Sequence, residues 1–102
     1  MKIAEKLLLK VKANLVLEHN ADDELLLTYI HAAVDYAQSY QKTTYRRRLP
    51  PSTEQAIIML SSHFYESRDG STGGFFADTA AAGGRVWETV RLLLAVNRNI
   101  EV

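Results

Sequence analysis

The sequence predicts an all-α fold, a compact four-helix domain, and three observations lead to it. Apolar residues recur at helical spacing in four separate stretches, two of these stretches open with helix-start signals, and turn-forming residues separate them. A chain of 102 residues, 47% of them hydrophobic and 24% charged, has the size and composition of one globular domain. We therefore expect a single domain over residues 1–102, built around one core.

The first two expected helices lie before residue 45. The apolar positions of the first recur every four residues, at Ile3, Leu7, Val11 and Leu15. For the second, Asn20 can cap the start, and the acids of the first turn oppose the positive helix end; they are Asp22, Asp23 and Glu24. The apolar face of this second helix is wide, which predicts that it packs against neighbours on two sides.

The remaining helices follow a proline pair. Pro50 pushes Leu49 to extended backbone, so the second helix should end before it. Ser52 and Gln55 have the spacing of a capping box, which predicts a third helix from about Thr53 to Arg68. We then expect a long Gly-rich loop between helices three and four, over residues 70–84, and a last helix from about residue 86 to residue 97.

The sequence offers no equipment for catalysis, so we expect no enzyme, no metal and no cofactor. It has no cysteine, its three histidines lie far apart, and no strained turn presents a serine nucleophile. Lys10 and Lys12 interrupt the only apolar run near the N-terminus, which excludes a membrane span there. Lysine plus arginine equals aspartate plus glutamate, at 12 each, so any attraction to nucleic acid must be local.

One local feature is a run of positive charge before the proline pair. Lys42 is followed by Arg46, Arg47 and Arg48, and no acid lies between Tyr36 and Leu49. Three arginines in a loop can neutralise backbone phosphates without reading base sequence. The alternative, a solvated loop that keeps the protein soluble, fits the charge equally well.

A second local feature is an aromatic pair within glycine-rich sequence. Phe75 and Phe76 lie in the expected loop, where solvent-exposed rings are unfavourable. An arm that orders against a neighbouring copy would bury them, which makes both residues a candidate subunit interface. Packing over the chain's own helices is the alternative.

Several short motifs, taken in order, resemble those of the small head-tail connector (adaptor, or DNA-packaging) proteins of tailed bacteriophages and prophages. The resemblance covers nearly the whole chain. The motifs are Asp22-Asp23-Glu24-Leu25-Leu26, Ala32-Ala33 with Tyr36, Leu49-Pro50-Pro51, Gln55-Ala56-Ile57, His63-Phe64-Tyr65-Glu66 with Arg68, and Val90-Arg91-Leu92-Leu93-Leu94. The sequence departs from the family pattern at Val96-Asn97, where a proline-aromatic pair is usual, and in its longer, more basic first helix.

The resemblance implies a structural subunit that forms a homo-oligomeric ring below the portal, joins head to tail and lines the passage for the genome. Its partners would be itself, the portal protein, a tail-side connector or stopper protein, and packaged phage DNA bound non-specifically, with no membrane. It would be made in the bacterial host cytoplasm and act at the head-tail junction of the virion. The arginine run would then face the DNA channel or the portal.

The main alternative is a small helical DNA-binding regulator, which the arginine run would also suit. A helix-turn-helix joins its helices through a turn of three or four residues. The expected link between helices two and three is longer and contains prolines, which argues against that alternative.

Overall fold

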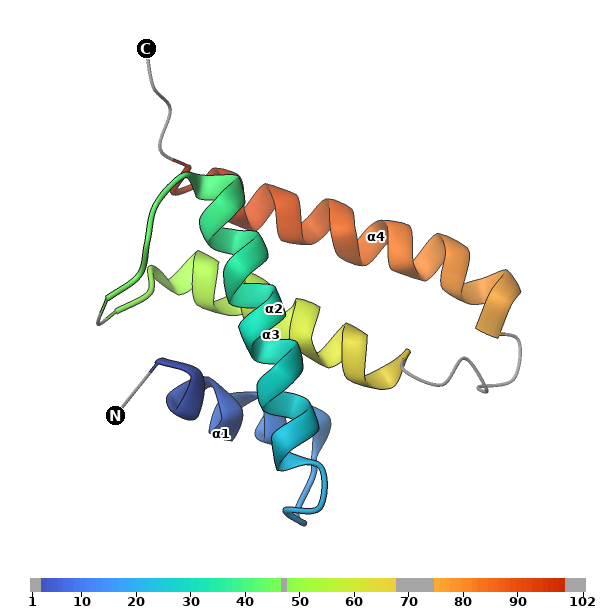
Figure 1. Ribbon diagram of the computed structural model, residues 1–102. Helices are drawn as coiled ribbons and strands as arrows, with labels where there is room; N and C mark the ends of the chain where they lie inside the picture. Colours follow the sequence, from blue (N-terminus) through green and yellow to red (C-terminus); the bar gives the residue numbers. More distant parts are fainter. Residues whose placement is uncertain (1–2, 47, 68–74, 99–102) are drawn as a thin grey trace.

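The computed structural model describes residues 3–46, 48–67 and 75–98, with only the backbone described for residues 75–83. These ranges contain four helices: α1 (Ile3–Leu15), α2 (Asp23–Gln41), α3 (Pro51–Glu66) and α4 (Phe75–Ala95). Helix α2 crosses α3, α4 runs alongside α3, and α1 packs against both α2 and α3 (Figure 1). The predicted all-α, four-helix fold is confirmed.

The core is formed where the four helices meet. Its fully buried side chains include Leu7 and Val11 from α1, as the four-residue spacing predicted. Helix α2 contacts α1, α3 and α4, which confirms that its wide apolar face serves more than one neighbour. The other buried apolar residues are Leu26, Ile30, Ala33, Ala37, Ala56, Ile57, Ile58, Leu60, Tyr65, Val90 and Leu94.

An aromatic cluster joins α4 to the rest of the bundle. The Trp87 ring meets Tyr36 of α2 edge-on, with centroids 5.1 Å apart, and Phe64 of α3 at 6.1 Å. Phe64 in turn lies 6.0 Å from Tyr29, back on α2. Such pairs stabilise by about 0.5–1.5 kcal/mol beyond the area they bury. The half-buried Trp87 of α4 therefore packs against both α2 and α3.

Two helix starts differ from the sequence prediction. Asp22, not Asn20, is the N-cap of α2, and its carboxylate accepts a hydrogen bond from the Tyr65 hydroxyl of α3. Helix α3 begins at Pro51, because proline at the first helical position has the right φ and no N–H to satisfy. The predicted capping box is therefore wrong, and Ser52 Oγ instead accepts a hydrogen bond from Asn97 Nδ2 at 2.8 Å.

Helix α4 also begins earlier than predicted. It starts at Phe75 rather than near Val86, so residues 75–84 of the expected loop are helical. The alanines among residues 77–82 are the strongest helix formers, and they offset the roughly 1 kcal/mol that each of Gly83 and Gly84 costs. The rest of the expected loop, residues 70–74, lies outside the described residues.

Helix α1 ends at a residue that is unusual for its backbone conformation. Val16 has φ 57°, and the Leu17 N–H bonds to the Lys12 carbonyl at 2.9 Å, the arrangement that normally places glycine at this position. A β-branched residue there is strained, and the left-handed backbone costs roughly 1–2 kcal/mol. The Val16 side chain is nonetheless 80% exposed, so packing within the chain offers little compensation.

Val16→Gly is expected to stabilise the protein by about 0.5–1 kcal/mol, because relief of the strain exceeds the added freedom of the unfolded chain. The melting temperature should rise by roughly 3–6 °C, measured by circular dichroism. Ala13→Gly, one turn earlier in the same helix, is the matched control and should lower it. A melting temperature for Val16→Gly at or below that of the parent would contradict this account.

Candidate functional site

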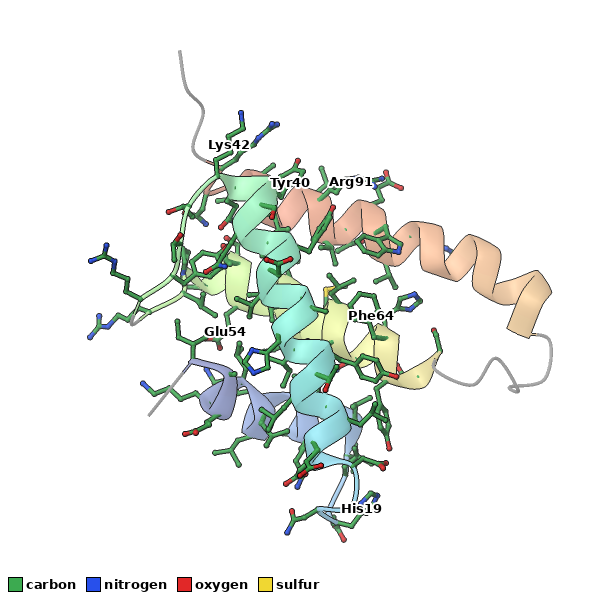
Figure 2. The ribbon with its side chains drawn as sticks, in the orientation of Figure 1. His19, Tyr40, Lys42, Glu54, Phe64 and Arg91 are labelled. Carbon is green, nitrogen blue, oxygen red and sulfur yellow. The ribbon has the colours of Figure 1, made fainter. Side chains whose placement is uncertain are left out.

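The arginine run lies at one end of the bundle, in the connection from α2 to α3. Helix α2 stops at Gln41, Lys42 takes a left-handed backbone with φ 56°, and the chain then continues to Pro50. Lys42, Arg46 and Arg48 are all exposed, and Lys42 extends away from the end of α2 in Figure 2. Arg47 lies outside the described residues. The structure thus presents these cations to solvent along the connection that follows α2.

The end of α4 adds a cation that sequence reasoning missed. The Arg98 guanidinium carbon lies 5.1 Å from the centroid of the Tyr40 ring on α2, a cation–π contact. Arg98, Arg46 and Arg48 border one surface groove of about 630 Å³, and no carboxylate of residues 3–46, 48–67 or 84–98 lines it. The other lining residues are Gln41, Thr43, Thr44, Tyr45, Pro50 and Asn97. We name Lys42, Arg46, Arg48 and Arg98 the basic end.

A buried hydrogen-bond network supports the basic end from beneath. Gln41 is fully buried, and its amide nitrogen donates to Thr53 Oγ1 at 2.8 Å and to the Leu94 carbonyl at 2.9 Å. The Tyr45 hydroxyl donates to Gln41 Oε1. Burial raises the pKa of Tyr45 to about 12, so the phenol stays protonated and able to donate at any physiological pH. The Gln41 side chain therefore links the α2–α3 connection, through Tyr45, to the last turn of α4, through Leu94.

The positive charges of the basic end fall into two groups: some stabilise helix ends, and the others are not needed for that. Helices α2 and α4 both finish here, and cations near a helix carboxyl terminus offset its partial negative charge. Lys42 directly follows α2 and Arg98 lies three residues after the end of α4, so both cations are near a helix carboxyl terminus. Arg46 and Arg48 lie farther along the connection, where helix ends do not require them. Their charge is available to an anionic partner.

The other predicted site residues are only partly described. Phe75 and Phe76 form the first turn of α4 in the backbone, and their side chains lie outside the described residues. The structure therefore gives their place in a helix and says nothing of what their rings contact. Their role as a subunit interface stays a prediction.

The three histidines lie on three different segments of the fold. His31 is exposed on α2, His63 is half-buried on α3, and His19 lies in the turn between α1 and α2 (Figure 2). Among residues 3–46, 48–67 and 84–98, no three histidine, aspartate or glutamate side chains are grouped as metal ligands would be. Within the described part of the chain, no helix is long and apolar enough to cross a membrane.

Comparison with known proteins supplies the family. A search of curated proteins and a search of solved structures gave no match. A family model described as phage gp6-like head-tail connector protein matches residues 5–79, which include most of α1, all of α2 and α3, and the first turn of α4. The matched range also contains the arginine run and the phenylalanine pair. The chain therefore belongs to the phage gp6-like head-tail connector family, whose members are structural proteins of the junction between head and tail.

Proposed function

We propose that this chain is the repeating subunit of a ring below the portal, which joins the phage head to the tail and lines the DNA passage. The family gives the structural connector role at the head-tail junction. The observation that supports the finer proposal is the basic end, where exposed cations from the α2–α3 connection and from beyond α4 border a groove to which the described residues contribute no carboxylate. The chain performs no reaction in this role.

The chemistry of the basic end suits a passage through which DNA must move. Guanidinium groups offer charge and forked donors to phosphate oxygens, and phosphate contacts carry no sequence information. Lys42, Arg46, Arg48 and Arg98 lie on the α2–α3 connection and beyond the end of α4, rather than along one exposed helix that could enter the major groove and read base edges. Non-specific contact lets the duplex slide while its charge is partly neutralised.

Assembly requires further surfaces. A ring needs a patch on one copy that meets a different patch on the next. We propose that Phe75 and Phe76 belong to one such patch, and that the partners above and below the ring are the portal protein and a tail-side connector or stopper protein. The subunit would be made in the bacterial host cytoplasm before it joins the head.

Electron microscopy of the concentrated protein, and of assembled heads, tests the ring directly. Closed rings below the portal are expected. Phe75→Ser combined with Phe76→Ser should abolish ring formation while leaving the circular dichroism of the monomer unchanged. Undiminished ring formation by this double variant would remove the two phenylalanines from the interface.

Replacing Arg46, Arg47 and Arg48 together by glutamine tests the DNA contact. Heads that carry the triple variant should retain less packaged DNA than an equal number of parent heads, measured by nuclease sensitivity. Arg85→Gln combined with Arg91→Gln, two exposed arginines of α4, is the control and should retain DNA like the parent. Sequence-selective duplex binding by the isolated chain would instead favour a DNA-binding regulator and overturn the proposal.

A further inference from the structure

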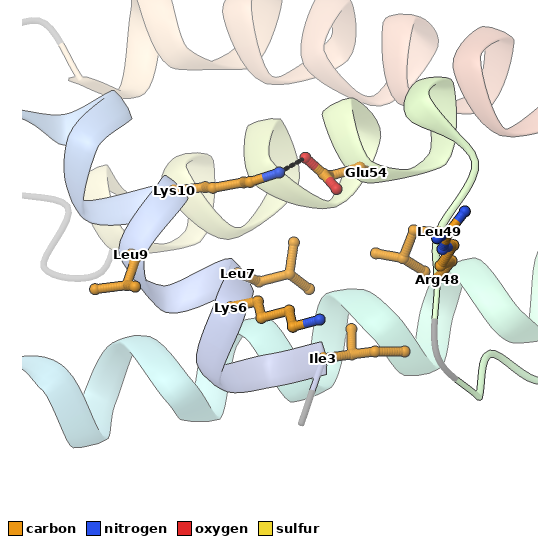
Figure 3. A pocket seen from close by; sticks show the side chains of 8 residues that line it. All are labelled: Ile3, Lys6, Leu7, Leu9, Lys10, Arg48, Leu49 and Glu54. Carbon is orange, nitrogen blue, oxygen red and sulfur yellow. Dashed lines mark hydrogen bonds and ion pairs between the residues drawn. The ribbon is translucent and has the colours of Figure 1, made fainter. Parts of the chain in front are cut away.

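A second groove, separate from the Gln41 network, lies between the first half of α1 and the segment that leads into α3 (Figure 3). It encloses about 430 Å³, within the roughly 300–1,000 Å³ typical of ligand sites. Its apolar lining is Ile3, Leu7, Leu9 and Leu49. Leu9 is 63% exposed, so an apolar partner would find surface that the fold itself leaves uncovered. We name this the α1 groove.

The charged residues of the α1 groove are mostly basic. They are Lys6, Lys10, Arg48 and Glu54. Lys10 forms an ion pair with Glu54, the one carboxylate that the described residues contribute to the lining (Figure 3). Lys6 and Arg48 have no ion-pair partner among the described residues. The groove therefore combines an apolar floor with two cations that remain available.

The complementary chemistry lies in residues 16–25, which comprise the connection from α1 to α2 and the start of α2, and which we name the α1–α2 turn. Val16 is 80% exposed in its strained conformation, and Leu25 is 36% exposed. Glu18 and Glu24 are exposed, and neither has an ion-pair partner in the described part of the chain. Asp23, by contrast, is held by Lys12 at 2.8 Å. The turn thus presents two apolar side chains and two available acids.

We propose that the α1 groove of one copy receives the α1–α2 turn of the next copy. The contact would place Val16 or Leu25 against Leu9 and the apolar floor, and Glu18 and Glu24 near Lys6 and Arg48. It would also supply a reason for an exposed valine at a position that favours glycine. Duplex DNA suits the groove less well, because the phosphates that would meet Lys6 and Arg48 have no apolar group to cover Leu9 and Leu49.

The two surfaces lie toward opposite ends of α1, so the contact is head-to-tail. Such a contact produces a closed ring when its rotation closes and an open chain when it does not. This inference rests on the proposed ring, to which it adds a second interface distinct from the phenylalanine pair. It involves no residue of the basic end except Arg48, which is left unchanged in the test.

Charge reversal on the two sides of the contact gives a sharp test. Lys6→Glu alone and Glu24→Lys alone should each weaken self-association at least about tenfold, measured by sedimentation velocity. Mixing these two single variants in equal amounts should restore association, because each remaining groove–turn pair then joins opposite charges. The double variant Lys6→Glu with Glu24→Lys should be restored for the same reason.

Matched control variants show whether an effect on association is specific to the groove–turn contact, or whether any change of charge or any loss of an exposed apolar side chain produces it. Arg91→Glu reverses an exposed charge on α4 and should leave association unchanged. Leu9→Ser should weaken association, whereas Leu92→Ser, at a similar exposure of 66%, should not. Circular dichroism should show that every variant is folded, since none of these side chains is buried.

The outcomes distinguish this inference from the ring itself. Rings of the parent protein that persist unchanged with Lys6→Glu would overturn the groove–turn contact and leave the ring standing. Open chains that respond to the charge swap, without closed rings in assembled heads, would support the contact and count against the ring. A parent protein that remains monomeric to millimolar concentration, stops at dimers, or binds duplex DNA through Lys6 would overturn the contact.

Discussion

Gln41→Ala is expected to lower the free energy of unfolding by about 3–4 kcal/mol, a large part of the total for a domain of this size. The substitution removes partners from Thr53 Oγ1, the Leu94 carbonyl and the Tyr45 hydroxyl. A buried polar group left without a partner costs roughly 1–3 kcal/mol. Urea unfolding followed by circular dichroism measures the change.

Two further variants show whether the loss of stability comes from the missing hydrogen bonds or only from the smaller side chain. Gln41→Glu keeps the size but loses both amide donors, so it should destabilise by at least about 2 kcal/mol. Gln55→Ala makes the alanine change at an exposed position of α3 and should change the stability by no more than about 0.5 kcal/mol. Equal effects at Gln41 and Gln55 would mean that the network contributes nothing.

Trp87→Ala should be nearly as damaging, with a loss of about 3 kcal/mol. The indole contacts Tyr36 and Phe64, and these rings connect α4 to α2 and α3. Hydrogen exchange should therefore speed up more at the amides of α4 than at those of α1. Trp87→Phe retains an aromatic ring and should cost only about 1 kcal/mol. If Trp87→Ala speeds up hydrogen exchange equally in α1 and α4, the aromatic cluster does not stabilise α4 locally.

The helix faces could be predicted because burial is periodic. Leu7, Ile30 and Leu60 fall on apolar stripes in the sequence, and all three are buried. The start of α4 could not be predicted from breakers alone, since the penalty for Gly83 and Gly84 competes with gains spread over the preceding alanines. The capping box failed because Pro51 offered an earlier start.

Only part of the candidate site could be predicted from the sequence. A charge run is visible in sequence, which is how Arg46 and Arg48 were found. Arg98 was missed because its approach to Tyr40 depends on where α4 ends beside α2. Gln41 did leave a signal, since it follows Ala33 and Ala37 at four-residue intervals on the buried side of α2. A polar residue on such a stripe indicates a buried network.

Helix α4 is one continuous helix, and this has a mechanical consequence. Its last turns are anchored through the Leu94 carbonyl and Trp87, whereas Phe75 begins its first turn. At 1.5 Å per residue, the distance from Phe75 to Leu94 is about 28 Å. A rotation of roughly 6° about the anchor would move the far end by about 3 Å. In the proposed ring, the fit of α4 among the aromatic rings would therefore limit how precisely neighbouring subunits can be positioned.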